Sequence, residues 1–152
     1  MTERPKLRRV LLKLSGAAFG SPEAPLDPAR VRYIAGEVAA ARAAGVACAV
    51  VVGGGNIVRG RRARDFGWPQ DAVDAMGMVA TVVNGLALRQ ALTAQGVGAT
   101  VVSALRAGEY CEDLCPEGAR ARLEEGEVVI FVGGTGRPFL STDTAALIRA
   151  LE

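Results

Sequence analysis

The sequence predicts an α/β fold in which helices cover both faces of a mainly parallel sheet. Short runs of β-branched residues alternate with longer helical segments along the 152 residues, and the runs 46–52 and 128–132 are almost entirely apolar. Strands without a polar face are typical of a parallel sheet buried between helices. Alternation of strands and helices favours right-handed parallel crossovers. We therefore expect a three-layer sandwich that forms one domain over residues 1–152.

The first half of the chain carries clear element boundaries. A strand is expected at 10–14, followed by a helix with Asp27 as N-cap and Pro28 at its first position. Gly45 is a typical stop for this helix, and strand 46–52 follows. The apolar face of the helix is expected to consist of Val31, Ile34, Ala35 and Val38.

The second half continues the alternation. A long helix is expected over 71–95, ended by Gly96, with one apolar side formed by Val73, Met76, Ala80, Val83 and Ala87. Strands follow at 99–103 and 128–132, separated by a short helix over 117–125. A last helix is expected to begin at Ser141 or Thr142 and to run to Glu152.

The composition excludes several kinds of chemistry. The chain has no histidine, which excludes Ser-His-Asp triads, Cys-His pairs and histidine metal ligands. A net charge of +2 argues against a dedicated nucleic-acid binder. The groups that remain available for function are backbone amides, lysine, arginine, carboxylates and hydroxyls. Such groups are suited to binding phosphate.

The three cysteines indicate reduced thiols in a cytoplasmic protein. Cys48 lies in an apolar run and is expected to be buried, while Cys111 and Cys115 lack the second pair of a zinc site. We expect no segment long enough to span a membrane. The polar N-terminus also lacks the apolar core of a signal peptide.

Lys13 is the first candidate for the functional site. It lies near the carboxyl end of an otherwise apolar strand. An unpaired buried ammonium costs several kcal/mol, so this lysine must be paired or must face a polar cleft. A phosphate is one natural partner. The alternative is a lysine that reaches solvent from an edge strand.

A glycine-rich turn follows the second strand. The residues Gly53-Gly54-Gly55-Asn56 allow backbone N–H groups to approach an anion, and Arg59 could add a bidentate contact. The turn matches neither a Walker loop nor the dinucleotide fingerprint. A flexible turn with a solvated arginine is the alternative.

The third candidate segment is 133–144, which combines glycines, hydroxyls and Asp143 at a helix start. Helix N-termini bind anions, although Ser141 or Thr142 could simply cap the helix. Carboxyl ends of parallel strands share one edge, where ligands bind, so the three segments are expected to converge. Asp74, by itself, is typical of a solvated helix residue.

Four segments together resemble the bacterial uridylate kinase (UMP kinase) family of the amino-acid kinase fold, similar to carbamate kinase. They are Lys13–Gly16, 53–60, 74–78 and 134–139, in that order, within a resemblance that runs from about Leu7 to Glu152. The first two segments are shared, in variant form, by other kinases of this fold, whereas the third and fourth are more specific. The 74–78 segment and the Thr-Gly-x-Pro-Phe run distinguish UMP kinases from aspartate, glutamate and carbamate kinases.

The resemblance implies transfer of the γ-phosphoryl group of ATP to UMP, with Mg²⁺, in pyrimidine nucleotide biosynthesis by a homohexamer. It implies catalytic roles for Lys13, Arg59 and Asp143, and ATP binding by Lys13, Leu14, Ser15, Gly16, Gly55 and Arg59. It implies UMP binding by Gly54, Asp74, Thr135, Gly136, Arg137, Pro138, Phe139, Leu140, Ser141 and Thr142.

The chain also departs from the family pattern. Ala17 stands where the family has glutamate near an effector-responsive region, Arg137 replaces asparagine, and Ser141 replaces threonine. The stretch Arg106–Arg120 matches poorly. Family chains continue beyond the last helix, so we expect this chain to hold the N-terminal, UMP-binding portion and to lack the C-terminal part.

Two alternative functions remain open from the sequence. One is an amino-acid kinase-fold enzyme that acts on a carboxylate or a carbamate. The other is a non-catalytic nucleotide-binding fragment or storage relative of the same fold.

Overall fold

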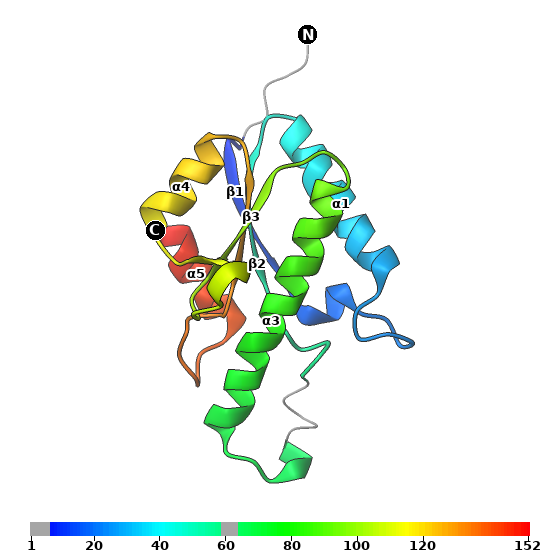
Figure 1. Cartoon of the computed structure of the whole chain (residues 1–152), viewed down its shortest axis with the longest axis vertical. Helices are drawn as coiled ribbons and strands as arrows, with labels where there is room; N and C mark the ends of the chain where they lie inside the picture. Colours follow the sequence, from blue (N-terminus) through cyan, green and yellow to red (C-terminus); the bar gives the residue numbers. More distant parts are fainter. Residues whose placement is uncertain (1–6, 59–63) are drawn as a thin grey trace.

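The centre of the molecule is a five-stranded parallel sheet (Figure 1). The computed structural model describes residues 7–58 and 64–152. In spatial order the strands are β1 (Arg9–Leu14), β2 (Ala47–Val52), β5 (Val128–Val132), β3 (Ala99–Ser103) and β4 (Glu112–Asp113). Each neighbouring pair is parallel, so the carboxyl ends of the strands lie at one edge of the sheet.

Helices cover both faces of this sheet, as the sequence predicts. Helices α1 (Pro28–Ala43) and α3 (Gln70–Thr93) lie on one face, and α4 (Pro116–Glu124) and α5 (Thr142–Leu151) lie on the other (Figure 1). The N-terminal half of α3 extends beyond the carboxyl edge of the strands (Figure 1). This edge is therefore walled by a helix on one side.

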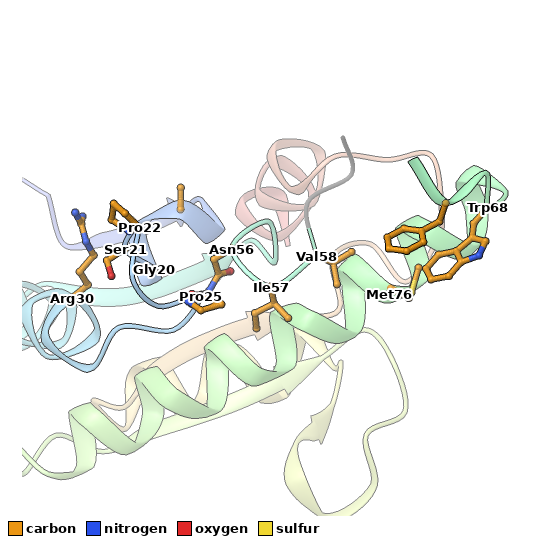
Figure 2. A pocket seen from close by; sticks show the side chains of 12 residues that line it. Gly20, Ser21, Pro22, Pro25, Arg30, Asn56, Ile57, Val58, Trp68 and Met76 are labelled. Carbon is orange, nitrogen blue, oxygen red and sulfur yellow. Dashed lines mark hydrogen bonds between the residues drawn. The ribbon is translucent and has the colours of Figure 1, made fainter. Parts of the chain in front are cut away.

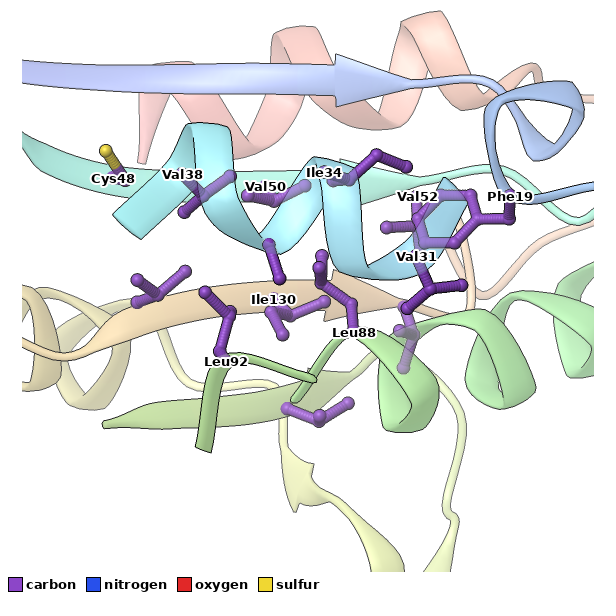
Figure 3. Close-up of a cluster of buried hydrophobic side chains, with 14 residues drawn as sticks. Phe19, Val31, Ile34, Val38, Cys48, Val50, Val52, Leu88, Leu92 and Ile130 are labelled. Carbon is purple, nitrogen blue, oxygen red and sulfur yellow. The ribbon is translucent and has the colours of Figure 1, made fainter. Parts of the chain in front are cut away.

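The apolar strands are buried on alternating faces. Val50 packs with Val31 and Leu88 in the core under α1 and α3, while the next residue, Val51, packs with Leu123 in the core under α4 and α5. Figure 3 shows the first of these cores. Full burial of such a side chain stabilises a fold by about 1.5–3 kcal/mol. The absence of a polar face in β2 follows from this two-sided burial.

Helix α1 begins and ends at the predicted positions. The carboxylate of Asp27 accepts a hydrogen bond from the Ala29 N–H at 2.8 Å, and Pro28 occupies the first helical position. After the helix, Gly45 adopts a φ of +88°, which L side chains rarely adopt. The four residues predicted to form the apolar face are all buried: Val31, Ile34, Ala35 and Val38.

The predicted apolar side of α3 is partly wrong. Val83 is 44% exposed, whereas the buried side includes Thr81, Asn84 and Gly85. This side of the helix lies against strand ends and glycine turns rather than against a uniform apolar surface. Small and polar residues therefore replace the large apolar ones that a helical period alone predicts.

The stretch Arg106–Arg120 contains a strand that the sequence did not predict. The two residues of β4 pair with Val102 and Ser103 of β3. Glutamate and aspartate are depleted in strands, which hides such a segment from propensity. Among the residues that the structure describes, three short 3₁₀ helices also connect the main elements: Gly16–Phe19, Arg64–Phe66 and Gly108–Tyr110.

Helix α3 corrects a second expectation. Its 24 residues are long and apolar enough to span a membrane by length and composition alone. Core helices pass the same test, and α3 packs beside α1 with Leu88 and Leu92 fully buried. One third of its apolar window is buried inside the molecule.

Substitution of Gly85 tests the close contact between α3 and β5. A Cβ at Gly85 would overlap Cγ1 of Val132, a buried side chain with little rotational freedom. We expect Gly85→Ala to lower the free energy of unfolding by about 1–3 kcal/mol in urea denaturation.

Gly77→Ala is the matched control on the same helix, because a Cβ at Gly77 meets no atom within 4 Å. Alanine there should raise the free energy of unfolding by about 0.5–1 kcal/mol. A Gly85→Ala protein as stable as wild type would contradict the close contact.

Candidate active site

The three candidate segments converge at the carboxyl edge of the sheet, as predicted. Strands β1, β2 and β5 are neighbours, with Lys13 opposite Val51 and Val51 opposite Phe131. The loops that follow these strands therefore leave the sheet side by side. This neighbourhood is the candidate active site.

Lys13 forms an ion pair with Asp143. The distance from Lys13 Nζ to Asp143 Oδ1 is 3.0 Å, and the two side chains are 31% and 77% exposed. Asp143 lies in the first turn of α5, which Ser141 caps by accepting a hydrogen bond from the Thr144 N–H at 3.1 Å. Lys13 thus has a partner, and it is also exposed on β1, an edge strand of the sheet, so the edge-strand alternative fits this residue as well.

The turns after β1 and β2 contact each other through their backbones. The Gly53 N–H donates to the Leu14 carbonyl at 2.8 Å. A Cβ on Gly16 would overlap Gly55 N and would lie 2.7 Å from Asn56 N. Glycine at position 16 is therefore required by a close approach. The same contact brings the Lys13–Gly16 segment against the glycine turn.

The loop 133–141 after β5 is shaped by glycines in the left-handed region. The φ values are +78° at Gly133, +56° at Gly134 and +75° at Gly136. The Gly133 N–H donates to Oγ1 of Thr81 at 2.7 Å, and that buried hydroxyl donates to the Met78 carbonyl at 2.6 Å. Thr81 therefore fixes the start of the loop to α3.

Asp74 fixes the far end of the same loop. Its Oδ2 accepts a hydrogen bond from the Phe139 N–H at 2.7 Å, and its Oδ1 accepts one from Gln70 at 2.8 Å. Phe139 has a φ of +66° and its side chain is 70% exposed. Asp74 is thus half-buried and bound to a loop, not the solvated residue that its position alone suggests.

A cavity of about 210 Å³ lies between α3 and the loops. Of the residues expected to bind UMP or phosphate, seven line it: Gly54, Gly55, Asp74, Arg137, Leu140, Ser141 and Thr142. The other described ones do not line it: Thr135, Gly136, Pro138, Phe139 and Asp143, which lie in the same chain segment as lining residues, and Lys13, Leu14, Ser15 and Gly16, which lie in the segment after β1. Arg59 lies outside the described residues.

Sequence reasoning gave no role to Thr81, which also lines this cavity. A threonine one turn from the 74–78 segment carries no motif of its own. The signal that could have found it is its position on α3, seven residues after Asp74, which places both residues on similar sides of the helix.

A larger cavity of about 840 Å³ is lined by Asn56, Ile57 and Val58, of which Val58 also lines the smaller cavity (Figure 2). Asn56 and Ile57 lie between its two ends, with Arg30 at one end and the aromatic residues at the other (Figure 2). There the rings of Phe66 and Trp68 stack with their centroids 4.6 Å apart. The smaller cavity is the candidate site because the polar groups converge there.

The cysteines lie outside this site. Cys48 is buried in the core, as predicted, and burial also raises the pKa of the half-buried Cys111 thiol. Cys115 is exposed and its thiol contacts Glu117. In residues 7–58 and 64–152, no three His, Cys, Asp or Glu side chains form a group that could hold a metal ion.

Thr81→Val tests the link between α3 and the loop 133–141. The substitution removes the acceptor of the buried Gly133 N–H, and an unsatisfied buried donor costs about 1–3 kcal/mol. We expect urea denaturation to show a loss of that size. Thr93→Val, at an exposed position of the same helix, should stay within about 0.5 kcal/mol of wild type. Equal losses in the two variants would contradict the link.

Known uridylate kinases resemble the chain over its whole length. The uridylate kinase of Brucella abortus biovar 1 (strain 9-941) is 48% identical over 153 aligned residues, which cover 100% of this chain and 64% of the relative. The uridylate kinase of Zymomonas mobilis is 46% identical, with 100% and 63% covered. The chain therefore spans about 64% of the length of such relatives.

Solved structures show the same fold. The UMP kinase of Ureaplasma parvum superimposes with a TM-score of 0.90 at 33% identity, over 96% of this chain and 64% of that chain. The UMP kinase of Bacillus anthracis gives a TM-score of 0.91 at 34% identity, over 95% and 60%. The model of the amino acid kinase family matches residues 8–152. With its parallel sheet and its convergent glycine loops, the chain belongs to the amino acid kinase family.

Proposed function

We propose that this chain belongs to an enzyme that transfers the γ-phosphoryl group of ATP to UMP and forms UDP and ADP. The observation that carries the proposal is the Lys13–Asp143 ion pair beside the glycine turns at the carboxyl edge. The names of the similar proteins, uridylate kinase and UMP kinase, support the choice of acceptor. The carboxylate and carbamate acceptors have no such support.

Phosphoryl transfer needs positioning and charge neutralisation more than a covalent nucleophile. An oxygen of the UMP phosphate attacks the γ-phosphorus, and the bond to the β-phosphate oxygen breaks. Lys13 would neutralise charge on the transferring group. The neighbouring ATP contacts would come from Leu14, Ser15, Gly16, Gly55 and Arg59. Ser15 would contribute its hydroxyl, Gly16 its backbone, and Arg59 its guanidinium.

The UMP pocket would be the cavity between α3 and the loop 133–141. At the floor of this cavity, Gly54 allows the glycine turn to lie close against α3, since a Cβ on Gly54 would lie 2.9 Å from Cβ of Ala80. Asp74 would accept a hydrogen bond from UMP with the same carboxylate that accepts the Phe139 N–H. The loop residues Thr135, Gly136, Arg137, Pro138, Phe139, Leu140, Ser141 and Thr142 would enclose the nucleotide.

Mg²⁺ would accompany ATP in this reaction. In kinase sites this ion needs only one or two carboxylates, because phosphates and water fill its remaining positions. Asp143 provides one exposed carboxylate beside Lys13, so the donor set fits such an ion. Asp143 would hold it, and Mg²⁺ when bound would neutralise phosphate charge.

We also propose, from the resemblance alone, that the enzyme serves pyrimidine nucleotide biosynthesis in the cytoplasm and assembles as a homohexamer. These points are independent of the site. Sedimentation of the purified protein would test the assembly state.

The activity is tested by release of ADP from ATP and Mg²⁺ with UMP, aspartate, glutamate or carbamate as acceptor. We expect release with UMP only, and a loss of roughly 10²–10³-fold in kcat for Lys13→Ala, the size typical of removing a group that stabilises the transition-state charge. Arg9→Ala, at the other end of β1, is the control and should stay close to wild type. Turnover with another acceptor, or full turnover of Lys13→Ala, would contradict the proposal.

Asp74→Asn tests the UMP pocket. Hydrogen bonds to charged groups contribute about 1.5–3 kcal/mol, so loss of the carboxylate charge should weaken UMP binding about tenfold or more. ATP binding should change little. Asp71→Asn, which alters an exposed carboxylate in the first turn of the same helix, should bind UMP as wild type does. Calorimetry that shows unchanged UMP affinity for Asp74→Asn would remove Asp74 from the pocket.

A further inference from the structure

Two asparagine side chains form a reciprocal hydrogen-bonded pair under the glycine turn. Nδ2 of Asn84 donates to Oδ1 of Asn56 at 2.8 Å, and Nδ2 of Asn56 donates to Oδ1 of Asn84 at 3.0 Å. Asn84 on α3 is fully buried and Asn56 is 8% exposed. We call Asn56 and Asn84 the amide pair.

The outer protons of the amide pair bind two backbone carbonyls. Asn84 donates its second proton to the Gly53 carbonyl at 2.7 Å, and Asn56 donates its second proton to the Pro25 carbonyl at 2.7 Å. Both NH₂ groups are therefore fully used. Because the pair is buried, loss of either member leaves unsatisfied donors and acceptors behind.

The amide pair binds the glycine turn through side-chain amides, in addition to the backbone hydrogen bond from the Gly53 N–H to the Leu14 carbonyl. Gly53, Gly54 and Gly55 have no side chains to pack, and glycine loses more conformational freedom on folding than any other residue. Within the turn, the Ile57 and Val58 N–H groups both bind the Gly54 carbonyl at 3.1 Å. The amide pair fixes this turn from below, through Gly53, to α3.

We propose that Asn84, acting on the Gly53 carbonyl and through Asn56, is a positioning residue that holds the glycine turn in the conformation in which its backbone receives the nucleotide. The role rests on the proposed function, since Gly54 and Gly55 are placed there at the UMP and phosphate contacts. Neither asparagine lines the 210 Å³ cavity. Their effect is therefore exerted through the backbone of the turn.

Asn84→Leu tests this role against Leu92→Ala, a core substitution on the same helix. Leu92 is fully buried and belongs to the core under α1 and α3. In unliganded protein, we expect hydrogen exchange of the Ile57 and Val58 amides to be roughly tenfold faster in Asn84→Leu than in Leu92→Ala, a ratio equivalent to about 1.4 kcal/mol of local opening. In calorimetry, UMP should bind Asn84→Leu about tenfold more weakly than wild type, while Leu92→Ala keeps its affinity.

The double variant Asn56→Leu/Asn84→Leu separates positioning from stability. In Asn84→Leu, the buried side-chain amide of Asn56 loses its partner. Replacing both asparagines by apolar groups removes that unsatisfied amide, so the double variant should have a higher free energy of unfolding than Asn84→Leu. The Gly53 carbonyl nevertheless remains untethered. We therefore expect hydrogen exchange of the Ile57 and Val58 amides in the double variant to stay fast, and UMP binding by the double variant to stay weak. The double variant also provides the test if Asn84→Leu does not fold.

Two results would overturn the proposal. One is equal exchange at Ile57 and Val58 in the asparagine variants and in Leu92→Ala. The other is wild-type UMP affinity in the asparagine variants despite faster exchange. A wild-type protein that does not bind UMP would refute the proposed function and the positioning role together, while the exchange data would still show whether the amide pair holds the turn.

Discussion

The close approach of backbones at the carboxyl edge is the constraint on which the site depends. The turn after β2 passes so near the end of β1 that a Cβ on Gly16 would overlap Gly55 N. On its other side, a Cβ on Gly54 would overlap the Gly77 carbonyl of α3. Side chains are thus excluded from both contacts. The parallel register brings the strand ends together, and glycine is what allows their loops to share the space.

A loop without side chains must obtain its rigidity from its neighbours. Helix α3 provides it at three points along one helix: Asp74 binds the Phe139 N–H, Thr81 binds the Gly133 N–H, and Asn84 binds the Gly53 carbonyl. The helix is itself held by a core of fully buried side chains. Helix α3 packs on the sheet and hydrogen-bonds to two loops that are distant from each other in sequence, so it holds both loops against the sheet.

Periodicity and capping in the sequence predict most of this fold because they reflect local physics. The cap at Asp27, the stops after α1 and α3, and the apolar strands all follow from residues close together in the chain. Asn84 and Thr81 escape such reasoning because a hydrophobic period counts polar residues as exposed. The short strand β4 escapes it because its two residues are acidic. In each case tertiary contacts, and not propensity, decide the outcome.

The sequence predicts a Lys13 that is paired, faces a polar cleft or reaches solvent from an edge strand. It does not identify Asp143 as the partner, because Asp143 is remote in the chain and only the fold brings it to 3.0 Å. The exposure of this pair suits an exchangeable partner. Exposed ion pairs contribute only about 0.2–1 kcal/mol, so a group with more negative charge than one carboxylate can replace Asp143 at little cost. A fully buried pair would resist replacement of one partner, since breaking the pair leaves an unpaired charge buried in the protein. The pair therefore keeps Lys13 at the edge of the sheet while leaving its ammonium available to a phosphate.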